Sequence, residues 1–178
     1  MVEKKKKHTK KPQNKEMTLS VMIEIPKGCR NKYEYDKKNK VFRFDRMLYS
    51  AVHYPSDYGF IPDTLSLDGD PLDVLVLMWE PTFPGCVIDV RPVGMFRMWD
   101  EKGQDEKVLC VPVNDPLWNH TRSLEDVPPH LLAEIEHFFS IYKDLEKKKT
   151  KIDGWHGISE TIKVIKEART RHKKKMKR

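Results

Sequence analysis

Seven short segments with the residue pattern of β-strands lie between residues 19 and 113. In the first, apolar residues alternate from Leu19 to Ile25, which is the period-2 pattern of a strand with one buried face. The other segments cover residues 32–36, 40–46, 72–79, 86–93, 94–100 and 107–113. They are rich in Val, Tyr and Phe and are separated by turn sequences such as Pro84-Gly85. Short strands at this spacing predict a barrel or a sandwich.

The last third of the chain has helical spacing instead. Asp126 and Pro128 form an acceptable helix start, and apolar residues then recur every three or four positions to about residue 145. A second helix is predicted from Ser159 to the beginning of the basic C-terminus at residue 166. We therefore expect a mainly β, α+β fold in which one long helix and a C-terminal helix pack on the outside of a small β-barrel.

Basic residues gather at the two ends of the chain. Residues 1–15 carry seven lysines and one glutamate, a net charge of +6, and residues 166–178 carry eight basic residues and one glutamate, a net of +7. Subtracting both from the total of +7 leaves −6 for the residues between them, so the folded part is acidic. We expect disordered basic tails at 1–17 and 166–178 around one domain at 18–165. The tails could make a weak contact with a polyanion such as RNA.

Several classes of protein do not fit the sequence. Cys29, Cys86 and Cys110 lie far apart without a CxxC pair, which argues against a disulfide framework and a zinc ribbon. No apolar run approaches the roughly 20 residues that cross a bilayer, and no apolar stretch follows the N-terminal charges as in a secretory signal. We expect a cytoplasmic protein that makes no membrane contact.

The densest functional pattern is D-G-D-P-L-D at residues 68–73. Asp68 and Asp70 project to the same side of an extended chain, and Asp73 begins an apolar strand after the bend at the proline. Three carboxylates aimed at one small volume need a cation to neutralise them. The all-oxygen set favours Mg²⁺ or Mn²⁺ over zinc. A calcium-binding EF-hand does not fit, because the loop lacks Gly at its sixth and Glu at its twelfth position. A solvated acidic turn is the structural alternative.

Further charged residues lie at the ends of other predicted strands. They are Glu24, Lys32, Glu34, Arg46, Asp100, Asp105 and Lys107. Each alone is typical of a polar surface. The chain lacks the G-x-S-x-G, G-x-x-x-x-G-K and H-E-x-x-H patterns of other enzymes. Many carboxylates and several cations without a nucleophile favour metal-assisted attack of water on a phosphate.

Several segments together resemble the family I soluble inorganic pyrophosphatases. They are YPSDYGFI at 54–61, DGDPLDVLV at 68–76, RPVG at 91–94, HFF at 137–139 and YKDLE at 142–146, with IEIP at 23–26, KYE at 32–34 and DR at 45–46. The resemblance runs from about Leu19 to Trp155. The short chain without large insertions resembles the bacterial, hexameric branch of the family.

This resemblance implies a closed, OB-like five-stranded β-barrel with helices, in agreement with the residue pattern. It implies an inorganic diphosphatase that hydrolyses pyrophosphate to two orthophosphates by direct attack of a hydroxide shared between metal ions. The cofactor implied is Mg²⁺, several ions per subunit, with Mn²⁺ as a substitute. The assembly implied is a homohexamer made of two trimers.

The resemblance also implies roles for individual residues. Asp70 matches the general base that deprotonates the attacking water. The metal ligands implied are Asp68, Asp73, Asp100, Asp105, Glu34 and, through water, Glu24. The substrate-binding residues implied are Lys32, Arg46, Tyr58, Lys107, Tyr142 and Lys143.

Two other functions are the alternatives. An OB-type nucleic-acid-binding module would account for a barrel with lysine-rich tails, but its binding face should be basic and aromatic. The set at the strand ends is dominated by Asp and Glu instead. A catalytically inactive interaction protein on the same scaffold is the second alternative. It is not favoured, because every matched functional position carries a usable side chain.

Overall fold

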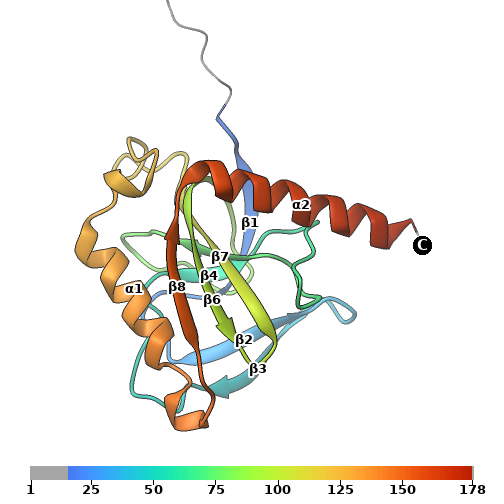
Figure 1. Ribbon diagram of the computed structural model, residues 1–178, viewed down its shortest axis with the longest axis vertical. Helices are drawn as coiled ribbons and strands as arrows, with labels where there is room; N and C mark the ends of the chain where they lie inside the picture. The colour runs from blue at the N-terminus through green and yellow to red at the C-terminus, as the bar shows by residue number, and fades with distance from the viewer. Residues whose placement is uncertain (1–15, 178) are drawn as a thin grey trace, which may run out of the picture.

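The structure, a computed structural model, describes residues 16–177 (Figure 1). Its strands are β1 (Leu19–Ile25), β2 (Asn31–Asp36), β3 (Val41–Met47), β4 (Asp57–Phe60), β5 (Asp73–Val76), β6 (Val87–Asp100), β7 (Gly103–Pro112) and β8 (Lys151–His156). Its α-helices are α1 (Pro129–Ile141) and α2 (Ile158–Met176), and short 3₁₀ turns lie at Leu124–Asp126 and Asp144–Glu146. No helix in this part of the chain is long and apolar enough to cross a membrane.

Five strands form a closed ring of backbone pairings. Their order is β1-β4-β5-β7-β6, and β6 pairs back to β1. Only β5 and β7 run parallel in this ring. The ring closes because β6 is 14 residues long, so its first half pairs with β1 and its second half with β8. The predicted mainly β fold with a closed five-stranded ring is confirmed. The segments 86–93 and 94–100 are one strand with a bulge rather than two strands.

Strand β5 is apolar on both faces because each face packs against a different helix. Leu75 belongs to a buried cluster with Phe139 of α1, whereas Val74 and Val76 belong to one with Ala168 of α2. The strand is therefore a continuous apolar run instead of an alternating one. In Figure 1, α1 lies beside β8, α2 crosses the ring at β6, and the β2–β3 hairpin lies at the end of the ring away from α2.

The pattern of the sequence does not predict β4, which has four residues and contains a glycine. Gly59 pairs with Ile23 of β1. A Cβ atom at residue 59 would lie 2.0 Å from the carbonyl oxygen of Met22 and 2.8 Å from the Cα of Ile23. Only glycine therefore allows β1 and β4 to approach this closely. The same Gly59 interrupts the apolar pattern of a strand, so the sequence does not predict β4.

The first helix is shorter than predicted. It begins at Pro129 and ends at Ile141, and a 3₁₀ turn on each side takes up the rest of the segment that we expected to be helical. The second helix is the longer one, with 19 residues.

The prediction of a basic tail at 166–178 is wrong for residues 166–176, which continue α2. Ala168 is fully buried in the core, and Val164 and Ile165 precede it on the same side of the helix. A helix that buries one face remains folded even where its other residues are largely basic.

The predicted N-terminal tail at 1–17 lies outside the described residues as far as residue 15. The two residues that are described contact the domain. A carboxylate oxygen of Glu16 lies 2.6 Å from Nε of Arg122, and Met17 packs against a core cluster. The folded domain thus begins before the predicted boundary at residue 18.

Candidate active site

A cavity of about 390 Å³ lies between the β2–β3 hairpin, the ends of the ring strands and the segment that follows α1. Its lining includes every residue that the sequence analysis assigned to a site. These are Glu24, Lys32, Glu34, Arg46, Tyr58, Asp68, Asp70, Asp73, Asp100, Asp105, Lys107, Tyr142 and Lys143. The structure therefore brings all of the predicted site residues together, although they are spread over 120 positions of the sequence.

Lys107 lies at the centre of the first charged group. The parallel pairing of β5 and β7 places it beside Asp73. Its Nζ donates to Oδ2 of Asp73 at 2.8 Å, to both carboxylate oxygens of Asp105 at 2.9 Å and to the Tyr58 hydroxyl at 3.2 Å. The Tyr58 hydroxyl donates in turn to Asp73. Burial alone would lower the pKa of Lys107, but the two carboxylates raise it well above its usual value. The ammonium group is thus charged and only 2% exposed.

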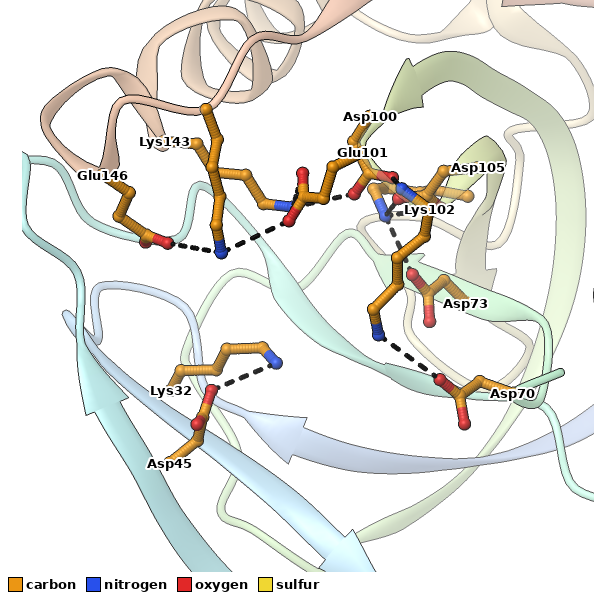
Figure 2. A network of polar contacts seen from close by, with 12 residues as sticks. Lys32, Asp45, Asp70, Asp73, Asp100, Glu101, Lys102, Asp105, Lys143 and Glu146 are labelled. Atoms are coloured by element: carbon orange, nitrogen blue, oxygen red, sulfur yellow. Dashed lines mark hydrogen bonds and ion pairs between the residues drawn. The ribbon is translucent and has the colours of Figure 1, made fainter. Parts of the chain in front are cut away.

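Lys143 forms a second group with the turn between β6 and β7. It follows α1 in the chain, and its Nζ donates to Oδ2 of Asp100 at 2.7 Å and to Oε2 of Glu101 at 3.2 Å (Figure 2). Burial works against the charge of Lys143, yet these neighbours leave its pKa raised. The contact fixes the end of α1 to the β6–β7 turn and closes one side of the cavity.

The β2–β3 hairpin supplies a third group on the opposite side. Figure 2 shows the ion pair of Lys32 with Asp45, in which Nζ lies 3.4 Å from Oδ2, and Lys32 also contacts Glu34. Arg46 lies beside Asp45 and donates from Nε to Oε1 of Glu146 at 3.0 Å. Because Glu146 lies in the 3₁₀ turn after α1, this ion pair joins the hairpin to the segment that carries Lys143.

Asp70 lies at the tip of the loop between β4 and β5. Its side chain is 64% exposed, and Lys102 Nζ is 3.9 Å from its Oδ2 (Figure 2). The backbone N–H of Asp70 donates to Oδ1 of Asp68, and Gly69 between them has a φ of +96°. The left-handed glycine allows the tight turn between two carboxylates that both line the cavity.

Glu24 is an acid of the cavity whose pKa is shifted by burial. Burial raises its pKa from 4.5 to about 7, although its carboxylate accepts a hydrogen bond from the backbone N–H of Tyr35 at 2.7 Å. Burial also raises the pKa of Asp105. Both carboxylates are ionised at lower cost beside additional positive charge, which a bound cation would supply.

The donor set of the cavity fits a hard divalent cation. Its acidic lining consists of carboxylates, and neither His nor Cys lies among its described lining residues. Within residues 16–177 no three metal-binding side chains meet at one point. Lysine side chains form ion pairs with five of the carboxylates, those of Glu34, Asp70, Asp73, Asp100 and Asp105. A bound cation would take over the neutralising role that lysine ammonium groups have in this arrangement.

Sequence reasoning assigned no role to several charged residues that contact the predicted site. They are Asp45, Glu101, Lys102, Glu146 and Lys148. Asp45 and Glu101 each adjoin an assigned residue in the chain, Arg46 and Asp100, so adjacency to an assigned charged residue at a strand end was a usable signal. Lys148 Nζ lies 3.2 Å from Glu146 and 3.3 Å from Glu101, and nothing in the sequence pattern indicates that it reaches them.

Comparison with known proteins places this site in a family. The family model for inorganic pyrophosphatase matches residues 21–173. An inorganic pyrophosphatase from Methanosarcina mazei is 65% identical over 152 residues, which cover 85% of this chain and 90% of that protein. One from Synechocystis is 53% identical and covers 84% of this chain and 88% of that protein.

Solved structures agree. The structure of an inorganic pyrophosphatase from Helicobacter pylori matches with a TM-score of 0.86 at 42% identity, over 88% of this chain and 94% of that chain. That of Thermus thermophilus matches with a TM-score of 0.85 at 42% identity, over 92% of this chain and 95% of that chain. Sequence and architecture agree over nearly the whole length of these relatives, and the chain belongs to the inorganic pyrophosphatase family.

Proposed function

We propose that this protein hydrolyses inorganic pyrophosphate to two orthophosphates. The observation that carries the proposal is one cavity in which phosphate-binding cations alternate with cation-binding carboxylates. A site for an anion alone would be basic throughout, and a site for a metal alone would not need six lysine, arginine and tyrosine side chains. Both sets are needed where a strongly anionic substrate binds together with divalent cations. Membership in the inorganic pyrophosphatase family supports the same reaction.

Inorganic pyrophosphatases are metal-dependent enzymes. For this chain we propose Mg²⁺, several ions per subunit, with Mn²⁺ as a substitute. The residues that would hold these ions are Asp68, Asp73, Asp100, Asp105, Glu34 and Glu24. A cation held there would neutralise phosphate oxygens and lower the pKa of a coordinated water molecule.

Asp70 is the proposed general base. Among the residues that the structure describes, its carboxylate has one ionic partner, Lys102, at 3.9 Å, and it is open to water. A carboxylate without a short hydrogen bond can accept a proton at Oδ1 or Oδ2 from a water molecule that attacks phosphorus. Its position on an exposed loop tip allows that water to lie between the loop and the substrate.

Two groups of side chains would bind the two phosphates. Lys143, Arg46 and Tyr142 would hold one phosphate, and Lys32, Lys107 and Tyr58 would hold the other; all six side chains line the cavity. They orient the substrate and neutralise the charge that develops on the departing phosphate. Among the matched residues of the cavity no side chain is required as a nucleophile, so the chemistry proceeds without a covalent intermediate.

The experiment that tests this function is phosphate release from pyrophosphate by the purified full-length chain. We expect turnover with Mg²⁺, slower turnover with Mn²⁺ and none with excess EDTA. Restoration of activity by Mg²⁺ after EDTA is the control for irreversible inactivation. A folded protein that releases no phosphate with either metal would contradict the proposal and would favour the alternative of an OB-type nucleic-acid-binding module.

We also propose that the chain forms a homohexamer. The supporting observation is the exposed, partly polar side of α1, where His130, Glu134 and His137 lie beside the residues of the core. Light scattering should give a mass close to six times the 21.1 kDa of one chain. A monomer at micromolar concentration would contradict this assembly.

A weak contact with a polyanion such as RNA is a further part of the proposal, together with a cytoplasmic location. The exposed side of α2 carries a stripe of lysines at helical spacing. They are Lys163, Lys166, Lys173 and Lys174, and Lys177 follows the last residue of the helix. Such a stripe would bind phosphates without sequence preference and place the enzyme where polymerisation releases pyrophosphate.

Retention on single-stranded RNA should weaken with salt, with a slope of about −0.7 per neutralised phosphate. Replacement of the stripe by glutamine should weaken the retention and leave turnover unchanged. RNA retention that is unchanged in this variant, or that is absent from the full-length protein at low salt, would contradict the contact. Cell fractionation with activity measured in each fraction tests the location.

A further inference from the structure

The loop between β4 and β5 carries both Asp68 and Asp70, and little holds its tip in place. Its base is closed by hydrogen bonds between Ile61 and Leu72, with N–H to carbonyl at 2.9 Å, and between Leu72 N–H and the Thr64 hydroxyl at 2.9 Å. The four residues of the tip, 67–70, are exposed. Apolar packing therefore contributes little to the position of the tip.

The C-terminal half of α2 contacts this loop between its base and its tip. Both backbone polar groups of Leu65 bond to the helix: its N–H donates to the carbonyl of Ala168 at 3.1 Å, and its carbonyl accepts from Nε of Arg171 at 2.8 Å. The next residue of the loop, Ser66, donates its N–H to the carbonyl of Asp70 at 2.7 Å. Two consecutive residues thus connect the helix to the backbone of Asp70.

We propose that Arg171 is a positioning residue for the acidic loop. Its guanidinium group acts through Leu65 and Ser66 on Asp68 and Asp70, and it touches neither substrate nor metal. The inference deepens the proposed pyrophosphate hydrolysis and rests on it for the role of the loop. Under this proposal the helical turn at 169–172 holds the acidic loop in place, a role that the basic composition of the segment does not indicate.

The surroundings of Arg171 fit this role. Its side chain is 30% exposed and lies 4.0 Å from Glu167, one turn earlier on the same side of α2. Arg171 also follows the buried Ala168 by three positions, so the helix directs it toward the loop rather than away from the domain. A second contact joins the same elements, because His172 Nε2 lies 3.7 Å from Oδ1 of Asp63.

The test compares Arg171→Met with Arg169→Met in the full-length protein. Arg169 lies two residues away on the same helix, and it makes no hydrogen bond or ion pair among the described residues, so its variant controls for the loss of charge. The first measurement is hydrogen exchange of the metal-free protein. We expect Arg171→Met to raise exchange in the segment 61–72 about fivefold, because a hydrogen bond from a charged donor is lost. The exchange of β6 and β7 should not change.

The second measurement is direct titration with Mn²⁺, which does not depend on turnover. In Arg171→Met the loop should be in its binding-competent position less often, so the dissociation constant for Mn²⁺ should rise about threefold. The value of kcat at saturating Mg²⁺ should change less than twofold. Arg171→Lys should restore most of the affinity, because one ammonium donor reaches the same carbonyl.

Exchange in Arg171→Met that equals that of Arg169→Met would overturn the proposal, and so would faster exchange with unchanged Mn²⁺ affinity. Absence of pyrophosphate hydrolysis in the parent protein would contradict the proposed function instead. The exchange and Mn²⁺ measurements would still show whether Arg171 positions the loop.

Discussion

Replacement of Lys107 by Met tests whether lysine neutralises the cavity when no divalent cation is bound. Lys107 is nearly fully buried, and its Nζ lies within 2.9 Å of three carboxylate oxygens of Asp73 and Asp105. The ring centroids of Tyr58 and Phe139 lie 5.3 and 5.0 Å from Nζ of Lys107. Methionine has a length similar to that of lysine and keeps the apolar contact with these rings. The substitution therefore removes the charge and retains most of the packing.

The expected loss follows from the carboxylates that remain. Removal of one partner from a buried ion pair costs about 3–5 kcal/mol, because the other charge is left unpaired. The side chains of Asp73 and Asp105 are 26% and 18% exposed, so water reduces this penalty. We expect the free energy of unfolding without metal to fall by about 2–3 kcal/mol. For a chain of this length the unfolding temperature would fall by roughly 4–12 °C.

The assay is thermal unfolding in EDTA and in Mg²⁺, with Lys163→Met on the exposed side of α2 as the control. A cation that binds only the folded variant at 100 times its dissociation constant returns about 2.7 kcal/mol. Mg²⁺ should therefore stabilise Lys107→Met more than the parent, although we expect turnover to stay low because the group proposed to bind phosphate is missing. An unfolding temperature in EDTA within 2 °C of that of the parent would refute the reasoning. For a chain of this length, 2 °C corresponds to a difference of about 1 kcal/mol at most in the free energy of unfolding.

Three further predictions concern other parts of the molecule. Asp70→Asn should lower kcat by about 10²–10⁴ at saturating Mg²⁺ and change Mn²⁺ affinity less than Asp73→Asn does; turnover within threefold of the parent would contradict its role as base. Lys102→Ala should lower kcat/KM about threefold at low ionic strength and leave kcat unchanged, an effect that high salt should remove, because an exposed rim charge steers the anion. Gly59→Ala should destabilise the fold by about 3 kcal/mol, measured by chemical unfolding, since its Cβ would meet the backbone of β1.

The parts of the fold that the sequence predicts are those with a regular pattern. Strand β1 alternates, and its bounds agree with the prediction. Strand β8 escapes prediction because its apolar residues, Ile152 and Trp155, are three positions apart, and Gly154 between them has a φ of +106° at a bulge in its pairing with β6. The bulge turns both residues toward the same core, which a period of two does not reveal.

All thirteen residues that the sequence assigned to a site line one cavity, whereas their individual roles stay predictions. These residues stand in short motifs with fixed spacing, so resemblance identifies them even where, as at Tyr142 and Lys143, the local pattern indicates only a helix. The residues that reasoning missed act through contacts across the fold. Arg171 bonds to a loop 106 positions earlier in the chain, and no local pattern records which loop a helix touches.

The arrangement around Lys107 links metal binding to substrate binding. Its three donors are engaged by Asp73, Asp105 and Tyr58, so the ammonium group must give up carboxylate contacts before it can bind a phosphate oxygen. Those contacts can be released at low cost only when another positive charge lies beside the two carboxylates. Pyrophosphate should therefore bind more tightly in the presence of Mg²⁺, and by linkage the affinity for Mg²⁺ should rise by the same factor when a non-hydrolysable diphosphate is bound. In Lys107→Met this coupling should weaken, because the exchange of partners that transmits it is gone.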